Sequence, residues 1–129
     1  MASYDKRHWD ERYPVARIEV PQITLPNGAT AEVTDTIIAN MRVKQITVKV
    51  NNNTGNATMT VQLRDDNGAV LWSEAAIAEN ATTVFQYYTL SGTDLPLNIL
   101  LQGTITVGVT PSGDPGASTG LVDVVLYGD

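Results

Sequence analysis

The chain's one histidine, His8, is the side chain best suited to act as a general base near neutral pH. A serine or threonine nucleophile would need such a base within hydrogen-bond reach. His8 lies in "SYDKRHWDERYP", close to the start of the sequence, and no G-x-S-x-G motif occurs anywhere in the chain. We therefore interpret His8 as a solvated or structural residue and predict no catalytic residue.

Acidic residues are the second possible source of chemistry, because two carboxylates on facing strands are enough for glycoside hydrolysis. Most of them fall in turn-like sequence, where solvation and turn hydrogen bonds explain them: Asp65, Asp66, Glu79, Asp94 and Asp114. Asp123 lies among apolar residues, and strand alternation points its side chain outward. A small glycoside-modifying enzyme is the least favoured of the functions considered.

The stretch "DDNGAVLWSE" begins like a calcium-binding loop. A loop of the EF-hand type starting at Asp65 needs oxygen ligands at its third and fifth positions and glycine at its sixth. Asn67 fits the third position, but Ala69 and Val70 occupy the other two. The chain also has no cysteine, so a thiolate site is excluded. We predict no metal site and no cofactor.

The first 17 residues form a segment of unusual composition, called the arm below. It holds four of the eight Lys and Arg residues and three of the eight aromatic residues. Three interpretations compete: a frayed terminus, a short amphipathic helix, and a clasp in which Trp9 and Tyr13 insert into a groove of a neighbouring chain. Aromatic residues and arginine dominate interface hot spots, which favours the clasp. Its predicted contact residues are Arg7, Trp9, Arg12, Tyr13 and Arg17.

Beyond the arm, Thr, Val and Ile alternate with polar residues, and Asn, Gly and Pro interrupt at short intervals, which is typical of strands. In "ATMTVQLRD" and in "TITVGVT" the apolar residues share one parity, and in "LVDVVLYGD" Val122, Val124 and Leu126 form one face. Asn67-Gly68 predicts a hairpin turn. Only "DTIIAN", residues 35–40, suggests a single helical turn.

One alternating stretch changes parity in its middle. In "MRVKQITVKV", Met41 and Val43 are odd-numbered, whereas Ile46, Val48 and Val50 are even-numbered. One extra residue near Lys44 and Gln45 would return all of these apolar side chains to the same face, so the sequence predicts a β-bulge there.

About eight short strands with turns between them predict an all-β fold, a two-sheet β-sandwich in one domain at residues 18–129. A jelly roll fits this number of strands best, with residues 1–17 as an extended N-terminal arm.

The aromatic residues of the body have two possible roles. We expect Trp72, Phe85, Tyr87 and Tyr88 to serve core or inter-subunit packing. The alternative is a sugar-stacking platform at the surface, made of Trp72, Tyr87 and Tyr88.

Charge separates the arm from the rest of the chain. Residues 1–17 carry a net charge of +1, whereas residues 18–129 carry four basic and eleven acidic residues and a net charge of −7. An acidic body repels phosphate backbones, so we expect no nucleic-acid partner. No apolar run is long enough to span a bilayer as a helix, and no signal peptide is recognisable, so we expect no membrane partner.

In type, the chain resembles the small capsid decoration, or cement, proteins of tailed bacteriophages. The resemblance rests on "SYDKRHWDERYP" as arm, "ITVKVNNNTGNATMTVQLRDDNGAVLW" as hairpin-rich body and "TVGVTPSGDPGASTGLVDVVLYGD" as closing strands. It implies a non-enzymatic virion protein on the capsid surface, made in the host cytoplasm. Such a protein would bind the major capsid protein and further copies of itself, often as a homotrimer, and would take no small-molecule substrate. The rival function is a carbohydrate-binding or adhesin module of a phage fibre or a secreted bacterial protein.

Overall fold

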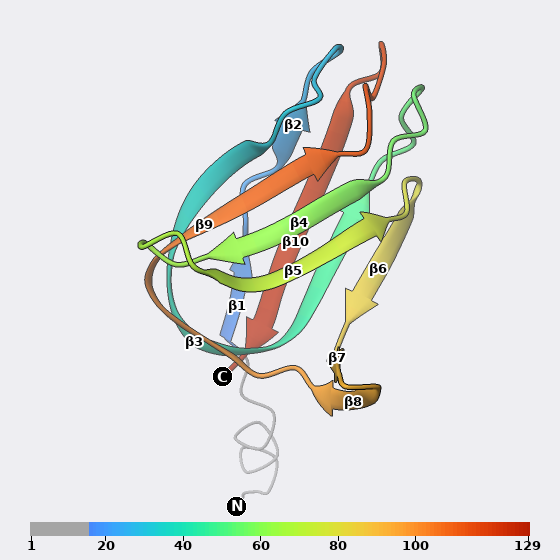
Figure 1. Cartoon of the computed structure of the whole chain (residues 1–129). Helices are drawn as coiled ribbons and strands as arrows, with labels where there is room; N and C mark the ends of the chain where they lie inside the picture. The colour runs from blue at the N-terminus through green and yellow to red at the C-terminus, as the bar shows by residue number, and fades with distance from the viewer. Residues whose placement is uncertain (1–15) are drawn as a thin grey trace, which may run out of the picture.

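The computed structural model describes residues 16–129, which form ten strands arranged in two packed layers (Figure 1). The strands are β1 (Ala16–Glu19), β2 (Ile23–Leu25), β3 (Val33–Val50), β4 (Met59–Arg64), β5 (Val70–Ile77), β6 (Ala81–Phe85), β7 (Tyr87–Leu90), β8 (Thr93–Pro96), β9 (Ile99–Pro111) and β10 (Gly120–Gly128). The predicted all-β class and two-layer sandwich are confirmed, while the assignment to a jelly roll stays a prediction.

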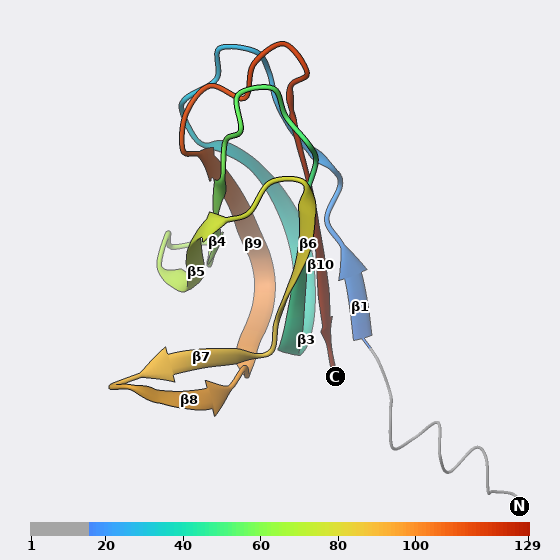
Figure 2. The same cartoon turned by 90° about the vertical axis from the view of Figure 1, so that its right-hand side faces the viewer.

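Strand β3 belongs to both layers. Its first part, Val33–Val43, pairs with β9, and β4 and β5 follow to complete the front layer of Figure 1. Its second part runs between β10 and β6 in the back layer, where β1 and β2 pair with the other edge of β10. All of these pairings are antiparallel, and Figure 2 shows the two layers packed face to face.

The predicted β-bulge lies where β3 passes from one layer to the other. Gln45 pairs with Tyr127 and Val43 pairs with Gly128, so Lys44 is the extra residue. Met41 and Val43 are buried before the bulge, and Ile46 is buried directly after it. Since one inserted residue exchanges the two faces of a strand, the bulge keeps apolar side chains inside as β3 changes layers.

The core lies between the layers and is filled by the residues that the alternation predicted. Met59, Val61 and Leu63 of β4 have no exposed surface, and the same holds for Ile105, Val107 and Val109 of β9. Val122, Val124 and Leu126 of β10 cover them from the back layer. The predicted outward orientation of Asp123 is also observed, and this side chain accepts a hydrogen bond from Gln22.

Two expectations about the strands were wrong. Residues 35–40 lie within β3, because pairing with β9 along their whole length outweighs any local helical preference. Furthermore, β3 and β9 have 18 and 13 residues and are far longer than the short strands expected. Asn40 in β3 and Gly103 in β9 resemble interruptions in the sequence, but the pairing of the two strands runs through both residues.

Loops from three parts of the chain are tied together at the end of the sandwich drawn uppermost in Figure 1. The Asp114 carboxylate accepts hydrogen bonds from the backbone N–H groups of Gly28, at 2.7 Å, and Gly116, at 2.8 Å. These two bonds lower the pKa of Asp114. The neighbouring Gly55 N–H donates to the Pro115 carbonyl at 2.7 Å.

Deleting Lys44 is expected to prevent folding, because every residue of β3 on one side of the gap would then face the wrong way. The matched control is Lys44→Ala, which keeps the bulge and removes only an exposed ion pair with Asp129 worth about 0–1 kcal/mol. Circular dichroism with thermal melting separates the two variants. A cooperative melt of the deletion variant near the wild-type Tm would contradict the role given to the bulge.

The Asp114→Asn variant is expected to be less stable than the wild type at neutral pH, with a difference that shrinks in acid. A carboxyl group whose pKa is lowered by folding stabilises the native state above its unfolded-state pKa, and this effect disappears as the pH falls through the folded-state pKa. Urea unfolding between pH 7 and pH 3 measures the difference, with exposed Asp66→Asn as control. A difference that stays constant with pH would show that the charge of Asp114 does not contribute.

Candidate functional site

A cleft of about 440 Å³ opens between β5 and the hairpin formed by β7 and β8, and is called the hairpin cleft below. The residues at the start of β9 complete its lining. The full set is Leu71, Trp72, Ser73, Tyr88, Leu97, Asn98, Ile99 and Leu100. Four of these eight side chains are aliphatic and two are aromatic, so the cleft is suited to apolar groups.

The hairpin turns through Ser91 and Gly92, which both have positive φ angles of 51° and 81°. Two such central residues are typical of the tight turns that join adjacent antiparallel strands. Cross-strand pairing places Tyr88 opposite Leu95 and Leu90 opposite Thr93, so one face of the hairpin is mainly apolar. The other face is more polar, and there Thr89 donates a 2.7 Å hydrogen bond to Asp94.

The hairpin projects from the sandwich (Figure 2). Within residues 16–129, neither β7 nor β8 packs extensively against any strand except the other. All four residues of β7 are exposed, Tyr88 by 44% and Tyr87 by 61%. A two-stranded hairpin alone in water is only marginally stable, and contiguous apolar exposure marks interaction surfaces. The hairpin therefore has the character of a contact element.

The base of the hairpin is fixed to the layer-changing part of β3. The Leu97 N–H donates to the Gln86 carbonyl at 2.9 Å, and the side chain of Gln86 donates to that of Gln45 at 2.8 Å. Leu97 is itself buried. The hairpin is thus held at its base, while its tip extends beyond the body.

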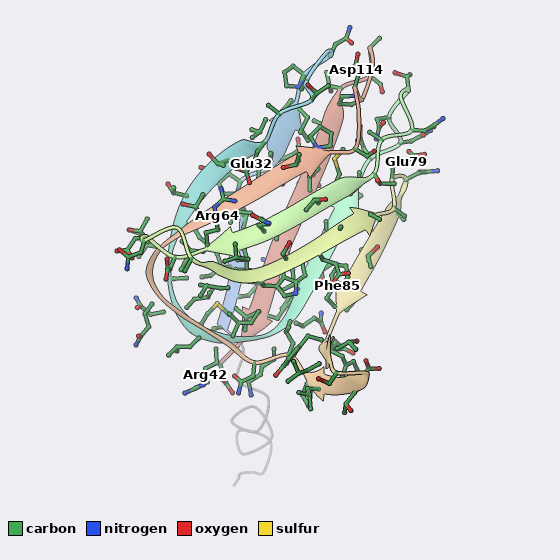
Figure 3. All side chains as sticks on the ribbon, viewed as in Figure 1. Glu32, Arg42, Arg64, Glu79, Phe85 and Asp114 are labelled. Carbon is green, nitrogen blue, oxygen red and sulfur yellow. The ribbon has the colours of Figure 1, made fainter. Side chains whose placement is uncertain are left out.

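Trp72 forms the inner wall of the cleft. It is only 7% exposed, and its ring meets that of Phe85 edge-on, with centroids 5.3 Å apart and planes inclined by 66°. Figure 3 places Phe85 at the lower end of β6, where the chain leaves the back layer for the hairpin. Trp72 is therefore mainly a packing residue, with little surface open to the cleft.

The alternative sugar-stacking platform is only partly brought together. Trp72 and Tyr88 line the same cleft, but the ring of Trp72 is buried. Tyr87 and Tyr88 are consecutive residues of β7, so their side chains lie on opposite faces of the hairpin. The three side chains do not form one exposed row.

Of the predicted arm contacts, Arg7, Trp9, Arg12 and Tyr13 lie outside the described residues. Arg17 lies within β1, opposite Tyr127 of β10, so β1 extends across the boundary predicted at residue 17. Its guanidinium group lies 5.7 Å from the centre of the Tyr127 ring and donates to Glu19 at 3.1 Å. Tyr127, and to a lesser extent Glu19, raise the pKa of Arg17.

The described part of the chain contains no group of three His, Cys, Asp or Glu residues placed to hold a metal ion. Over the same residues there is no helix long and apolar enough to cross a membrane.

Several residues of the cleft were not recognised in the sequence. Leu71, Leu97, Ile99 and Leu100 line the cleft, but their sequence surroundings indicate only apolar strand residues. The dipeptide Ser91-Gly92 was the available signal, since Ser-Gly marks a turn and places two short strands side by side. No local pattern indicates that this hairpin stands away from the body.

Comparison with known proteins identifies the fold. No family model matches the chain, and no curated protein matches its sequence significantly. Its structure is similar to a chain in the capsid asymmetric unit of cyanophage Pam1, with a TM-score of 0.56 and 12% identity over 89% of this chain and 84% of that one. The protein thus shares its fold with a chain of a phage capsid structure.

Two looser similarities have TM-scores too low to support an argument. One is the acid-stable capsid structure of Helicobacter pylori bacteriophage KHP30, with a TM-score of 0.47 and 13% identity over 89% of this chain and 87% of that one. The other is a carbohydrate-binding module in complex with calcium and xylotriose, with a TM-score of 0.44 and 15% identity over 87% of this chain and 98% of that one.

Substitution in the cleft is expected to separate packing residues from contact residues. Trp72→Ala should lower the free energy of unfolding by about 3–5 kcal/mol, the usual cost of deleting a buried large aromatic side chain. Tyr88→Ala removes an exposed side chain and should change it by less than about 0.5 kcal/mol. Denaturant unfolding of both variants provides the measurement. Equal losses of stability would contradict the assignment of Trp72 to core packing and of Tyr88 to the contact surface.

Proposed function

We propose that this protein is a non-enzymatic structural component of a bacteriophage virion: a decoration, or cement, protein that lies on the capsid surface and bridges capsomers. One observation carries the proposal. The core of the sandwich is well packed, yet the molecule presents an apolar hairpin and cleft that nothing in the described chain covers. The fold shared with a chain of the Pam1 capsid supports a role in such a shell.

In this proposal the partners are the major capsid protein and other copies of the chain, assembled as a homotrimer after synthesis in the host cytoplasm. The arm residues Arg7, Trp9, Arg12 and Tyr13 contact a neighbouring subunit. Arg17 contributes from the edge strand β1, where its side chain already packs on Tyr127. Several simultaneous weak contacts hold such a protein on a repetitive surface more firmly than any one of them alone.

The absence of catalysis is also part of the proposal. Its support is that several acidic side chains have structural partners. Glu32 forms a two-point ion pair with Arg64 at 2.7 and 2.9 Å (Figure 3). Asp65 accepts hydrogen bonds from the backbone of its own turn, and Asp114 ties the loops at the far end of the sandwich. These roles account for the three carboxylates Glu32, Asp65 and Asp114 without a reaction.

A second candidate function is carbohydrate binding, because Trp72 and Tyr88 share a cleft with Asn98. Binding on a glycan array that is lost in the Tyr88→Ala variant would favour this function over the structural one.

Two measurements test the structural role. The purified protein is expected to have the mass of a trimer by light scattering, and deletion of residues 1–14 should reduce that mass while leaving the circular dichroism spectrum folded. The protein should also cosediment with particles assembled from the capsid protein encoded beside its own gene. A monomer that does not cosediment would overturn the proposal.

A further inference from the structure

The apolar lining of the hairpin cleft continues along the hairpin. Tyr88 lines the cleft and also lies on the apolar face of the hairpin. Leu90 and Leu95 extend this face toward the tip of the hairpin. On the opposite side, Leu100 is 46% exposed at the start of β9. The result is an elongated apolar surface with Trp72 at its inner end.

The strands around this surface have unpaired edges. Among residues 16–129, β5 is the last strand of the front layer, and β7 pairs only with β8. Such edges offer free backbone N–H and C=O groups, while the cleft between them offers space for side chains. An extended peptide with bulky apolar side chains satisfies both features, as in strand addition at sheet edges.

The chain itself contains a segment of this kind. Residues 1–15 precede β1 and include Tyr4, Trp9 and Tyr13. Fifteen residues reach about 50 Å when extended, whereas a domain of this size has a radius of gyration of about 14 Å. The segment is therefore long enough to reach a neighbouring copy.

The charges near the cleft permit this contact. Residues 70–100, which include the whole lining, contain the acidic Glu74, Glu79 and Asp94 and no Lys, Arg or His. Arg7 and Arg12 would thus meet no basic residue of this stretch, and the basic residue of another strand that lies beside the lining is Arg42, opposite Leu100. Electrostatic attraction of this kind aids docking and register more than it adds affinity.

The neighbouring copy, rather than the same chain, is favoured by the position of β1. Figure 2 shows β1 and the hairpin on opposite sides of the sandwich. Residues 1–15 join the sandwich at Ala16 of β1. To enter the cleft of the same copy, they would have to cross from the side of β1 to the side of the hairpin. A neighbour's segment can approach the cleft directly, and repeating this head-to-tail contact closes a ring when the rotation between successive copies is a whole fraction of a turn.

We propose that the hairpin cleft of each copy receives residues 1–15 of a neighbouring copy, with Trp9 as the principal apolar anchor. This inference rests on the proposed function, since it names the surface through which copies associate.

Photo-crosslinking of the full-length protein tests the contact. Trp9 is replaced by p-benzoylphenylalanine, and the protein is mixed with an equal amount of heavy-isotope-labelled wild-type chain before irradiation. Mass spectrometry should find crosslinks that join light residue 9 to heavy peptides from residues 70–77 or 87–100. Crosslinks confined to one copy, crosslinks to other surfaces, or no crosslinks would each overturn the inference.

Two cleft variants and a matched control strengthen the test. Leu100→Glu and Tyr88→Ala should each lower the yield of these crosslinks by about tenfold, as expected for loss of an interface anchor. Ile38→Glu should leave the yield unchanged, because Ile38 is 77% exposed on β3 and does not line the cleft. An equal loss in all three variants would contradict the inference.

Cosedimentation with capsid particles is measured on the same samples. Particle binding without the crosslink would refute the binding of residues 1–15 in the hairpin cleft, but it would agree with the proposed function. The crosslink without particle binding would refute the proposed function instead.

Discussion

The fold depends on a single strand that is shared by both layers. β3 pairs with β9 in one layer and with β10 and β6 in the other, and the extra residue Lys44 lies between the two parts. Without that residue, one layer could bury its apolar side chains only by exposing those of the other. The packing of the core thus follows from a backbone irregularity of one residue.

The same part of β3 determines where the hairpin cleft forms. Gln45, directly after the bulge, receives the hydrogen bond from Gln86 that holds the hairpin base, and Val43 pairs with Ile99 in the cleft wall. A contact surface on a rigid corner of the sandwich keeps its shape before a partner arrives, which reduces the entropy lost on association. Four large hydrophobic side chains that are exposed in residues 16–129 lie on the hairpin or in the cleft: Tyr87, Tyr88, Leu90 and Leu100.

The sequence predicted features that depend on alternation and on local turn chemistry. The buried faces of β4, β9 and β10, the bulge at Lys44 and the turn at Asn67-Gly68 all follow from short-range patterns, and all are observed. The prediction was wrong where pairing between distant segments determines the conformation. Residues 35–40 are an example, because their strand conformation depends on β9, more than sixty residues away. The candidate site was recognised only through Trp72 and Tyr88. Whether Leu90 or Leu100 faces core or solvent depends on tertiary placement, which alternation does not report.

The pairing of β1 with β10 has a mechanical consequence. The four residues of β1 run antiparallel to the end of β10, with Ala16 opposite Gly128 and Glu19 opposite Val125. A force applied at Ala16 along the strand axis loads all the hydrogen bonds between β1 and β10 in shear, so these bonds must break together. A pull across the sheet would instead break them one after another at much lower force. The strand that carries any load from the N-terminal segment is therefore strong in one direction and easily peeled in the other.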